Sequence, residues 1–278
     1  MRYYRAFIVA FLAVCLGFLT ACSDGPANAT DREQLTYDEI VNTGLANVCP
    51  ELDETARGSI EISSDQTYQI TDMCLQPQRF FVKEEGKKRR AEEFVEGKIL
   101  TRSTTSLDQV EGTVEVSSDG VISFQEEGGI DFQPITVQLP GGEQIPFMFT
   151  IKELDAKSEP GFESINTSTD LKGDLFVPSY RGAVFLDPKG RGIASGYDNA
   201  IALPANADGE ELTRANQKRY QTGEGEMSLQ ITKVDGETGE IAGNFVSIQP
   251  SDTDMGADDP EEVKIKGTFY GRVAPKID

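Results

Sequence analysis

Alternating apolar and polar residues, broken by short glycine-rich turns, restrict the fold of this chain more than any other feature. The clearest hairpin signal is the sequence SDG at 118–120, which separates alternating runs at 113–116 and 121–124. Asp-Gly between such runs favours a tight antiparallel connection. Similar pairs of runs flank turns at 140–142 and 235–239. The pattern predicts an all-β fold, either an antiparallel sandwich or a barrel.

The last alternating run, residues 263–270, favours the barrel. A glycine in line with its apolar residues suits a sheet that must bend. The residues expected to face inward are Val263, Ile265, Gly267 and Phe269. Those expected to face outward are Lys264, Lys266, Thr268 and Tyr270.

Other segments predict shorter elements. Strand-like runs at 59–62, 67–71 and 80–82 are expected to form separate short strands. Apolar spacing predicts a short helix over 35–45, which starts with a capping box, and a solvent-facing helix within 205–218.

The first 22 residues have the pattern of an export signal. Two arginines precede an apolar run from Ala6 to Leu19, which is shorter than the ~20 residues that a membrane-spanning helix needs. The run ends in LTAC, which resembles the lipobox of bacterial lipoproteins, so the signal would be residues 1–21 and Cys22 would be lipidated. Cleavage after Ala29, followed by simple secretion, is the alternative.

Removal of the signal leaves two cysteines, Cys49 and Cys74. In an exported protein the two are expected to pair, and closing the loop between them would stabilise the fold by about 3.5 kcal/mol in the chain-entropy model. Two independent buried thiols are the alternative. A metal site is disfavoured, because the chain has no CxxC spacing and no histidine.

Composition excludes several classes of function. A formal net charge of −21 repels nucleic acid and anionic lipid, so a partner surface should be basic or bridged by cations. Without histidine, Ser-His-Asp triads and histidine zinc sites are excluded. A carboxylate-based enzyme, such as a carbonic anhydrase or a glycosidase, stays open as an alternative, although nothing marks two of the 47 acidic residues as a pair.

The stretch 178–204, rich in glycine and proline, is a candidate binding loop. It carries Arg181, Asp187, Lys189 and Arg191 among tyrosines and aliphatic residues. A loop of this length in a compact domain usually binds something or is disordered. The pattern alone leaves two interpretations, a packed surface connection and a docking element.

Five stretches of the chain resemble one known family. They are LTYDEIVNTGLANVCPEL at 35–52, TSLDQVEG at 105–112, GGIDFQPITVQLPGGE at 128–143, NTSTDLKGDLFVPSYRGAVFLDPKGRG at 166–192, and DGETGEIAGNF followed by PSDTDMGA within 235–257. Together they resemble the manganese-stabilising extrinsic proteins of photosystem II, of cyanobacterial type.

The resemblance implies a fold and a role. It implies an eight-stranded antiparallel barrel in one domain over 35–278, after a linker at 22–34, with an extended head insertion at about 150–201. It implies a non-catalytic subunit in the thylakoid lumen, peripheral on the lumenal membrane face, or on the periplasmic face of the plasma membrane where thylakoids are absent. The implied partners are the intrinsic reaction-centre and antenna subunits and other extrinsic subunits.

The same resemblance assigns residue roles. It implies a disulfide between Cys49 and Cys74. Docking on the photosystem is implied for Tyr37, Asp38, Glu39, Ile40, Arg181, Lys189 and Arg191. Roles in water and proton channels are implied for Asp187, Asp252 and Asp254.

The resemblance also bears on ions. The protein would have no cofactor of its own, would lie beside the manganese-calcium cluster held by its partners, and would help to retain calcium and chloride. A calcium site is implied at Glu84, Glu143 and Glu261, whose carboxylates suit that cation. A free-standing calcium-binding lipoprotein is a further alternative function.

Overall fold

The computed structural model describes residues 47–52, 56–84, 93–102, 104–178, 222–252 and 259–276. The strands are β1 (Ile60–Glu61), β2 (Tyr68–Glu84), β3 (Glu93–Ile99), β4 (Leu107–Val116), β5 (Ile122–Ile130), β6 (Phe132–Gln138), β7 (Gln144–Thr150), β8 (Asp155–Lys157), β9 (Ser164–Ile165), β10 (Asp170–Val177), β11 (Gly223–Val234), β12 (Glu240–Pro250) and β13 (Glu262–Pro275). The part of the chain described here contains no helix with the length and apolar character that crossing a membrane requires.

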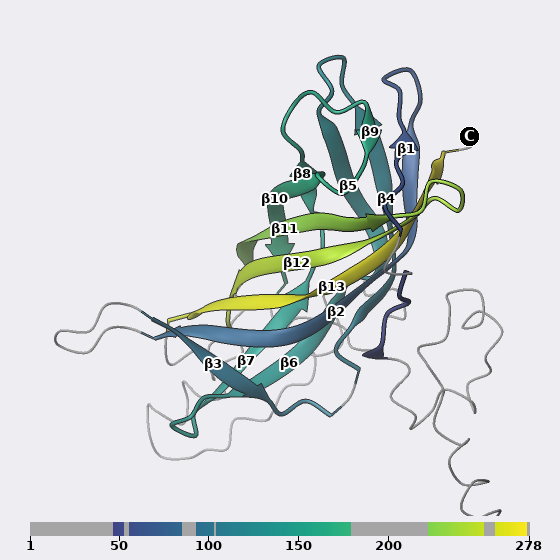
Figure 1. Ribbon diagram of the computed structural model, residues 1–278. Coiled ribbons are helices and arrows are strands. Elements are labelled where there is room, and N and C mark those ends of the chain that lie inside the picture. Colours follow the sequence, from purple (N-terminus) through teal and green to yellow (C-terminus); the bar gives the residue numbers. More distant parts are fainter. Residues whose placement is uncertain are drawn as a thin grey trace, which may run out of the picture.

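Eight antiparallel strands close a barrel in the order β2, β4, β5, β8, β10, β11, β12, β13, and β13 pairs back onto β2 (Figure 1). This confirms the predicted all-β barrel. The three expected hairpins are also present as β4–β5, β6–β7 and β11–β12. The turns between alternating runs were therefore a reliable signal for the connections between neighbouring strands.

One expectation for the first half of the chain was wrong, because residues 68–71 and 80–82 belong to a single strand, β2. Its first half pairs with β4 and its second half with β3, while β13 pairs along nearly its whole length. Irregular register near Asp72, which has a positive φ of 54°, bends the strand between these partners. The bend interrupts the sequence alternation, so the strand looks like separate pieces.

Beyond the second half of β2, the sheet continues through β3, β6 and β7 (Figure 1). Phe147 and Phe149 of β7 pack into the same core as the barrel strands. The predicted head insertion at 150–201 is described only to residue 178, and this part supplies β8 and β10 to the barrel wall. The remainder of the insertion and both predicted helices lie outside the described residues.

The barrel interior is filled by alternate residues of each strand, including large rings. Phe245 faces Gly267 across the β12–β13 ladder, and Gly243 faces Phe269 on the same two strands. A Cβ on Gly267 would lie 2.7 Å from the Phe245 ring, and one on Gly243 would lie 2.8 Å from the Phe269 ring. Each glycine therefore leaves room for the ring opposite, which explains the glycine at the predicted inward position.

Tyr270 lies on the outward side of β13, as predicted, but it is only 1% exposed. Tyr270 lies beside Cys74 of β2 and Ala242 of β12 on the outer side of the wall. A second apolar cluster forms there, separate from the interior core, where Cys49 and Leu52 from the amino-terminal segment pack over these residues. The alternation correctly gives the side of the sheet but does not reveal the segment that covers it.

Candidate functional site

The amino-terminal segment 47–52, called the strap below, is fastened to the outer wall of the barrel. Cys49 forms a disulfide with Cys74 of β2, with 5.6 Å between the Cα atoms, which confirms the expected pairing. The Cys49 amide donates to Oε1 of Gln76 at 3.0 Å. Lys233 Nζ donates to the Leu52 carbonyl at 2.8 Å. The Ser106 hydroxyl donates to the Asn47 carbonyl at 2.8 Å. Covalent and polar contacts therefore fix the strap at both ends and at Cys49.

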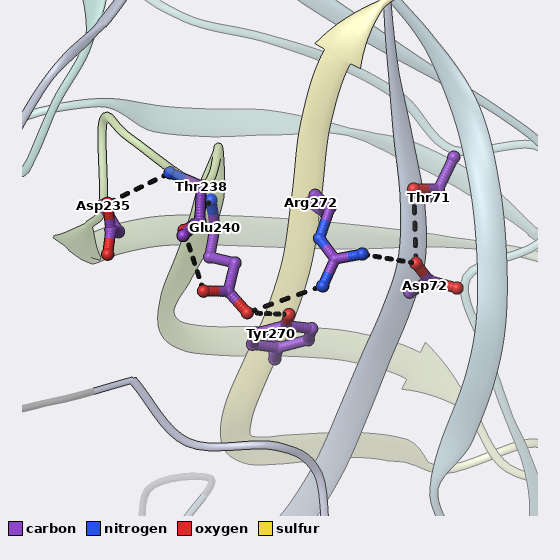
Figure 2. Close-up of polar contacts among 7 residues, drawn as sticks. All are labelled: Thr71, Asp72, Asp235, Thr238, Glu240, Tyr270 and Arg272. Atoms are coloured by element: carbon purple, nitrogen blue, oxygen red, sulfur yellow. Dashed lines mark hydrogen bonds and ion pairs between the residues drawn. The ribbon is translucent and has the colours of Figure 1, made fainter. Parts of the chain in front are cut away.

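A polar network borders the strap at the β11–β12 turn (Figure 2). The Tyr270 hydroxyl donates to Oε1 of Glu240 at 2.5 Å. The same carboxylate accepts from the Thr238 hydroxyl at 2.8 Å and lies 3.7 Å from Nη2 of Arg272. Arg272 Nη1 lies 3.8 Å from Oδ2 of Asp72. Burial and the bond to Glu240 raise the pKa of the Tyr270 phenol well above its usual range.

This network gives the buried Tyr270 hydroxyl an acceptor, as a buried polar group requires. It joins β2, β12 and β13 on the side that the strap covers. The strap thus packs on a part of the wall where side-chain contacts link three strands. The predicted docking residues Tyr37, Asp38, Glu39 and Ile40 precede the strap in sequence and lie outside the described residues.

Residues 179–221, called the loop region below, include the predicted binding loop and lie outside the described residues, but the strand ends that they connect lie side by side. Val177, the last residue of β10, pairs with Gly223, the first residue of β11. These residues and their neighbours line a cavity of about 290 Å³, with Met148, Pro250 and Asp252 on its other sides. The strand ends on both sides of segment 179–221 therefore border the same hollow.

Asp252 is held at this barrel end by its backbone. Its amide donates to the Pro146 carbonyl at 2.9 Å. The preceding residue, Ser251, donates its amide to the Glu261 carbonyl at 2.7 Å, and its hydroxyl accepts from the Glu261 amide at 2.8 Å. These bonds close the base of the β12–β13 connection beside the cavity. A carboxylate in this position can accept hydrogen bonds from water entering the hollow.

Of the residues predicted for docking, water channels and lipidation, only Asp252 lies in the described part of the chain. Residues Arg181, Asp187, Lys189, Arg191, Asp254 and Cys22 lie outside the described residues. For the predicted calcium ligands, Glu84 ends β2, Glu143 lies between β6 and β7, and Glu261 precedes β13. No three carboxylates, cysteines or histidines in the described ranges are grouped so that they could hold a metal ion.

Glu126 is a buried carboxyl that the sequence prediction missed. It lies on β5 at 7% exposure, and its Oε2 accepts from the Glu153 amide at 2.7 Å. Its Oε1 has no hydrogen-bond partner among the residues that the structure describes. Burial raises the pKa of this carboxyl to about 7, and the charge of Asp131 acts in the same direction, against the nearby Lys152. The signal was a glutamate two residues after Phe124, on the inward side of an alternating strand.

Comparison with known protein families accounts for almost the whole chain. A family model described as manganese-stabilising protein / photosystem II polypeptide matches residues 33–273. This span includes the strap, the disulfide, the barrel and the loop region attached to its end.

Individual relatives agree with that match. Photosystem II extrinsic protein O of Crocosphaera subtropica is 64% identical over 274 residues, covering 98% of this chain and 99% of the relative. The protein of the same name from Nostoc sp. is 62% identical over 271 residues, with 97% and 99% covered. Oxygen-evolving enhancer protein 1 of Volvox carteri is 48% identical over 254 residues, covering 90% of this chain and 84% of that protein.

Proposed function

Because the chain belongs to the manganese-stabilising protein family of photosystem II, we propose that it docks on the lumenal face of that complex and caps the manganese-calcium cluster. It is an extrinsic, non-catalytic subunit of photosystem II. The match over residues 33–273 is the observation that carries this proposal, because it spans the barrel and the segments attached to it.

We infer two points of docking. The first is the segment before the strap, with Tyr37, Asp38, Glu39 and Ile40. The strap supports this role, because a disulfide and hydrogen bonds hold its end against the barrel wall. A fastened end limits the freedom of the preceding residues, which lowers the entropy that docking must remove.

The second point of docking is the loop that carries Arg181, Lys189 and Arg191. Both ends of the loop region join the same barrel end, which gives the loop a rigid base. An arginine fork can hold a carboxylate of an intrinsic subunit through two hydrogen bonds, while a lysine contributes a point charge.

The channel residues would act beside this loop. Asp187, Asp252 and Asp254 are proposed to accept hydrogen bonds from water leaving the cluster and to carry protons away from it. The support comes from Asp252, whose backbone is fixed at the edge of the cavity where the loop region begins. Carboxylates at such an edge order water without expelling it.

Ion retention follows from the cap rather than from a cofactor of the protein itself. A closely docked barrel would slow the escape of calcium and chloride from the cluster. Calcium binding at Glu84, Glu143 and Glu261 is a separate proposal. Isothermal titration of the mature protein with calcium tests it, with a Glu84→Gln/Glu261→Gln variant for comparison.

Export through a signal at 1–21 and acylation at Cys22 are also proposed. Mass spectrometry of the mature amino terminus tests both.

Reconstitution tests the proposed function. Photosystem II membranes stripped of their extrinsic proteins should regain stable oxygen evolution when the purified protein is added, and should retain manganese longer than membranes without it. The same quantity of protein unfolded beforehand is the control. Failure of the folded protein to bind the membranes or to restore oxygen evolution would overturn the proposal.

A further inference from the structure

We propose that the outer face of β13, β2 and β3 is a third docking surface, which binds an acidic segment of a protein in the photosystem II complex. The surface, called the cation–aromatic patch, consists of Arg79, Phe81, Phe94, Lys264 and Lys266. The proposal rests on the proposed function for the identity of the complex. It concerns a part of the outer side of β2 and β13 farther along these strands than Cys74 and Tyr270, which the strap covers.

Strand register brings the patch together from three strands. Lys264 lies opposite Phe81 and Lys266 lies opposite Arg79 on the β13–β2 ladder. Phe94 comes from β3, which pairs with the other edge of β2. The residues between them, Phe80, Val82, Val263 and Ile265, face the barrel interior and are at most 3% exposed. The patch residues therefore share the outer side of the wall.

The cations of the patch lie against rings. Lys264 Nζ is 3.6 Å from the centroid of the Phe94 ring, and Lys266 Nζ is 5.7 Å from that of Phe81. The guanidinium carbon of Arg79 is 4.9 Å from the Phe81 centroid. Within the described ranges, neither lysine forms an ion pair with a carboxylate. A ring face attracts an ammonium group without taking up its three donors, so these donors can still bind carboxylates.

The charge of the patch opposes that of the chain. Acidic residues outnumber basic ones by 47 to 26 in the whole sequence. On this face, four cations lie beside two carboxylates: Glu96 pairs with Arg79 at 2.9 Å, and Glu262 lies 4.0 Å from Lys83. The other two cations are Lys264 and Lys266. A chain that repels anions as a whole thus offers one local surface that attracts them.

The patch fits a protein segment better than an anionic membrane or a nucleic acid. Glu96 is about half exposed at the edge of the patch, and an extended anionic surface would meet it with repulsion. A protein segment can place carboxylates over the lysines and an apolar side chain over the half-buried rings. Aromatic residues and arginine are also the types enriched at protein interfaces.

A charge-reversal experiment with a matched control tests the patch. The variant Lys264→Glu/Lys266→Glu is compared with Lys157→Glu/Lys172→Glu, which changes the net charge equally at exposed lysines of β8 and β10. Binding of each full mature chain to stripped photosystem II membranes is measured at one ionic strength. The patch variant should bind at least about 10-fold more weakly than the wild type, and the control variant within about 2-fold.

A second pair of variants and a lipid-binding measurement complete the test. Lys264→Gln/Lys266→Gln, with Lys157→Gln/Lys172→Gln as its control, replaces the charge reversal if circular dichroism shows that the glutamate variant is not folded. Equal affinity of patch and control variants would overturn the inference while leaving the proposed function intact. Loss of binding to vesicles containing phosphatidylglycerol, without loss on stripped membranes, would also overturn it, in favour of a lipid surface. Absence of wild-type binding would instead overturn the proposed function and this inference with it.

Discussion

Phe269 and Tyr270 are neighbours on β13, and both are almost completely buried, at 3% and 1% exposure. Phe269 faces the barrel interior, where the other strands cover it, and belongs to the main core. Tyr270 faces outward, where the strap covers it as part of a second cluster. The interior core holds the barrel together, whereas the outer cluster holds a separate segment onto the barrel. The two clusters should therefore respond differently to mutation.

The largest loss of stability is expected in the interior. Phe245 is 1% exposed and stacks on Phe149, with 5.6 Å between the ring centroids. Phe245→Ala should lower the free energy of unfolding by about 3–5 kcal/mol, because it leaves a cavity that the barrel cannot close. Chemical denaturation measures this loss. Val246→Ala, at the half-buried outward position beside it, is the matched control, and an equal loss in both variants would contradict a dominant interior core.

The next largest effect should come from the fastening of the strap. Cys49→Ser/Cys74→Ser removes the disulfide and should cost about 3.5 kcal/mol in the chain-entropy model. The barrel should nevertheless stay folded, because the interior core does not include these residues. Hydrogen exchange should show lost protection at the Cys49 amide and retained protection on β11 and β12. Loss of protection on these strands as well would show that the two clusters form one cooperative unit.

The buried carboxyl of Glu126 on β5 predicts that the free energy of unfolding depends on pH through a group in the barrel interior. The pKa of Glu126 is raised from 4.5 to about 7 in the folded chain, so the folded state holds its proton more tightly than the unfolded state. Its stabilising contribution is complete below about pH 4.5 and is lost as the pH rises to about 7, by at most about 3 kcal/mol.

Glu126→Gln should remove this dependence. Denaturation between pH 4.5 and 7 should show the wild type losing stability relative to the variant. Asp131 and Lys152, which lie near Glu126 and form an ion pair at 3.1 Å, are present in both proteins. Parallel pH profiles for the two proteins would contradict the raised pKa.

A smaller effect is expected at the hydroxyl beside the strap. Tyr270→Phe removes the hydrogen bond to Glu240 but leaves Thr238 and Arg272 near that carboxylate. The loss should be about 1–2 kcal/mol, since Glu240 keeps other partners. Thermal denaturation measures it. A loss of unfolding free energy as large as that of Phe245→Ala would mean that the outer cluster stabilises the barrel as strongly as the interior core does.

Sequence alternation predicted the interior far better than the exterior. The hairpins around 118–120, 140–142 and 235–239 were identified because their signals are local. The length of β2 was missed because bulges interrupt its alternation. The burial of Tyr270 was missed because it depends on a segment more than 200 residues away, and the alternation of one strand carries no information about such a cover.

The candidate sites divide in the same way. Pairing of Cys49 with Cys74 followed from the small number of cysteines in an exported chain. The cation–aromatic patch was not predicted, because its members come from three strands and only the register brings them together. Glu126 could have been noticed as a carboxylate at an inward position, but its raised pKa depends on burial within the closed barrel.

The central claim is that the protein docks through segments attached to a stable barrel. The double variant Arg181→Gln/Arg191→Gln in the loop region tests this claim most directly. The free energy of unfolding should change by no more than about 0.5 kcal/mol, as is usual for surface charges. Affinity for stripped photosystem II membranes, measured through recovery of oxygen evolution, should fall at least about 10-fold. A folded double variant that binds and restores oxygen evolution as well as the wild type would contradict the role of the loop in docking.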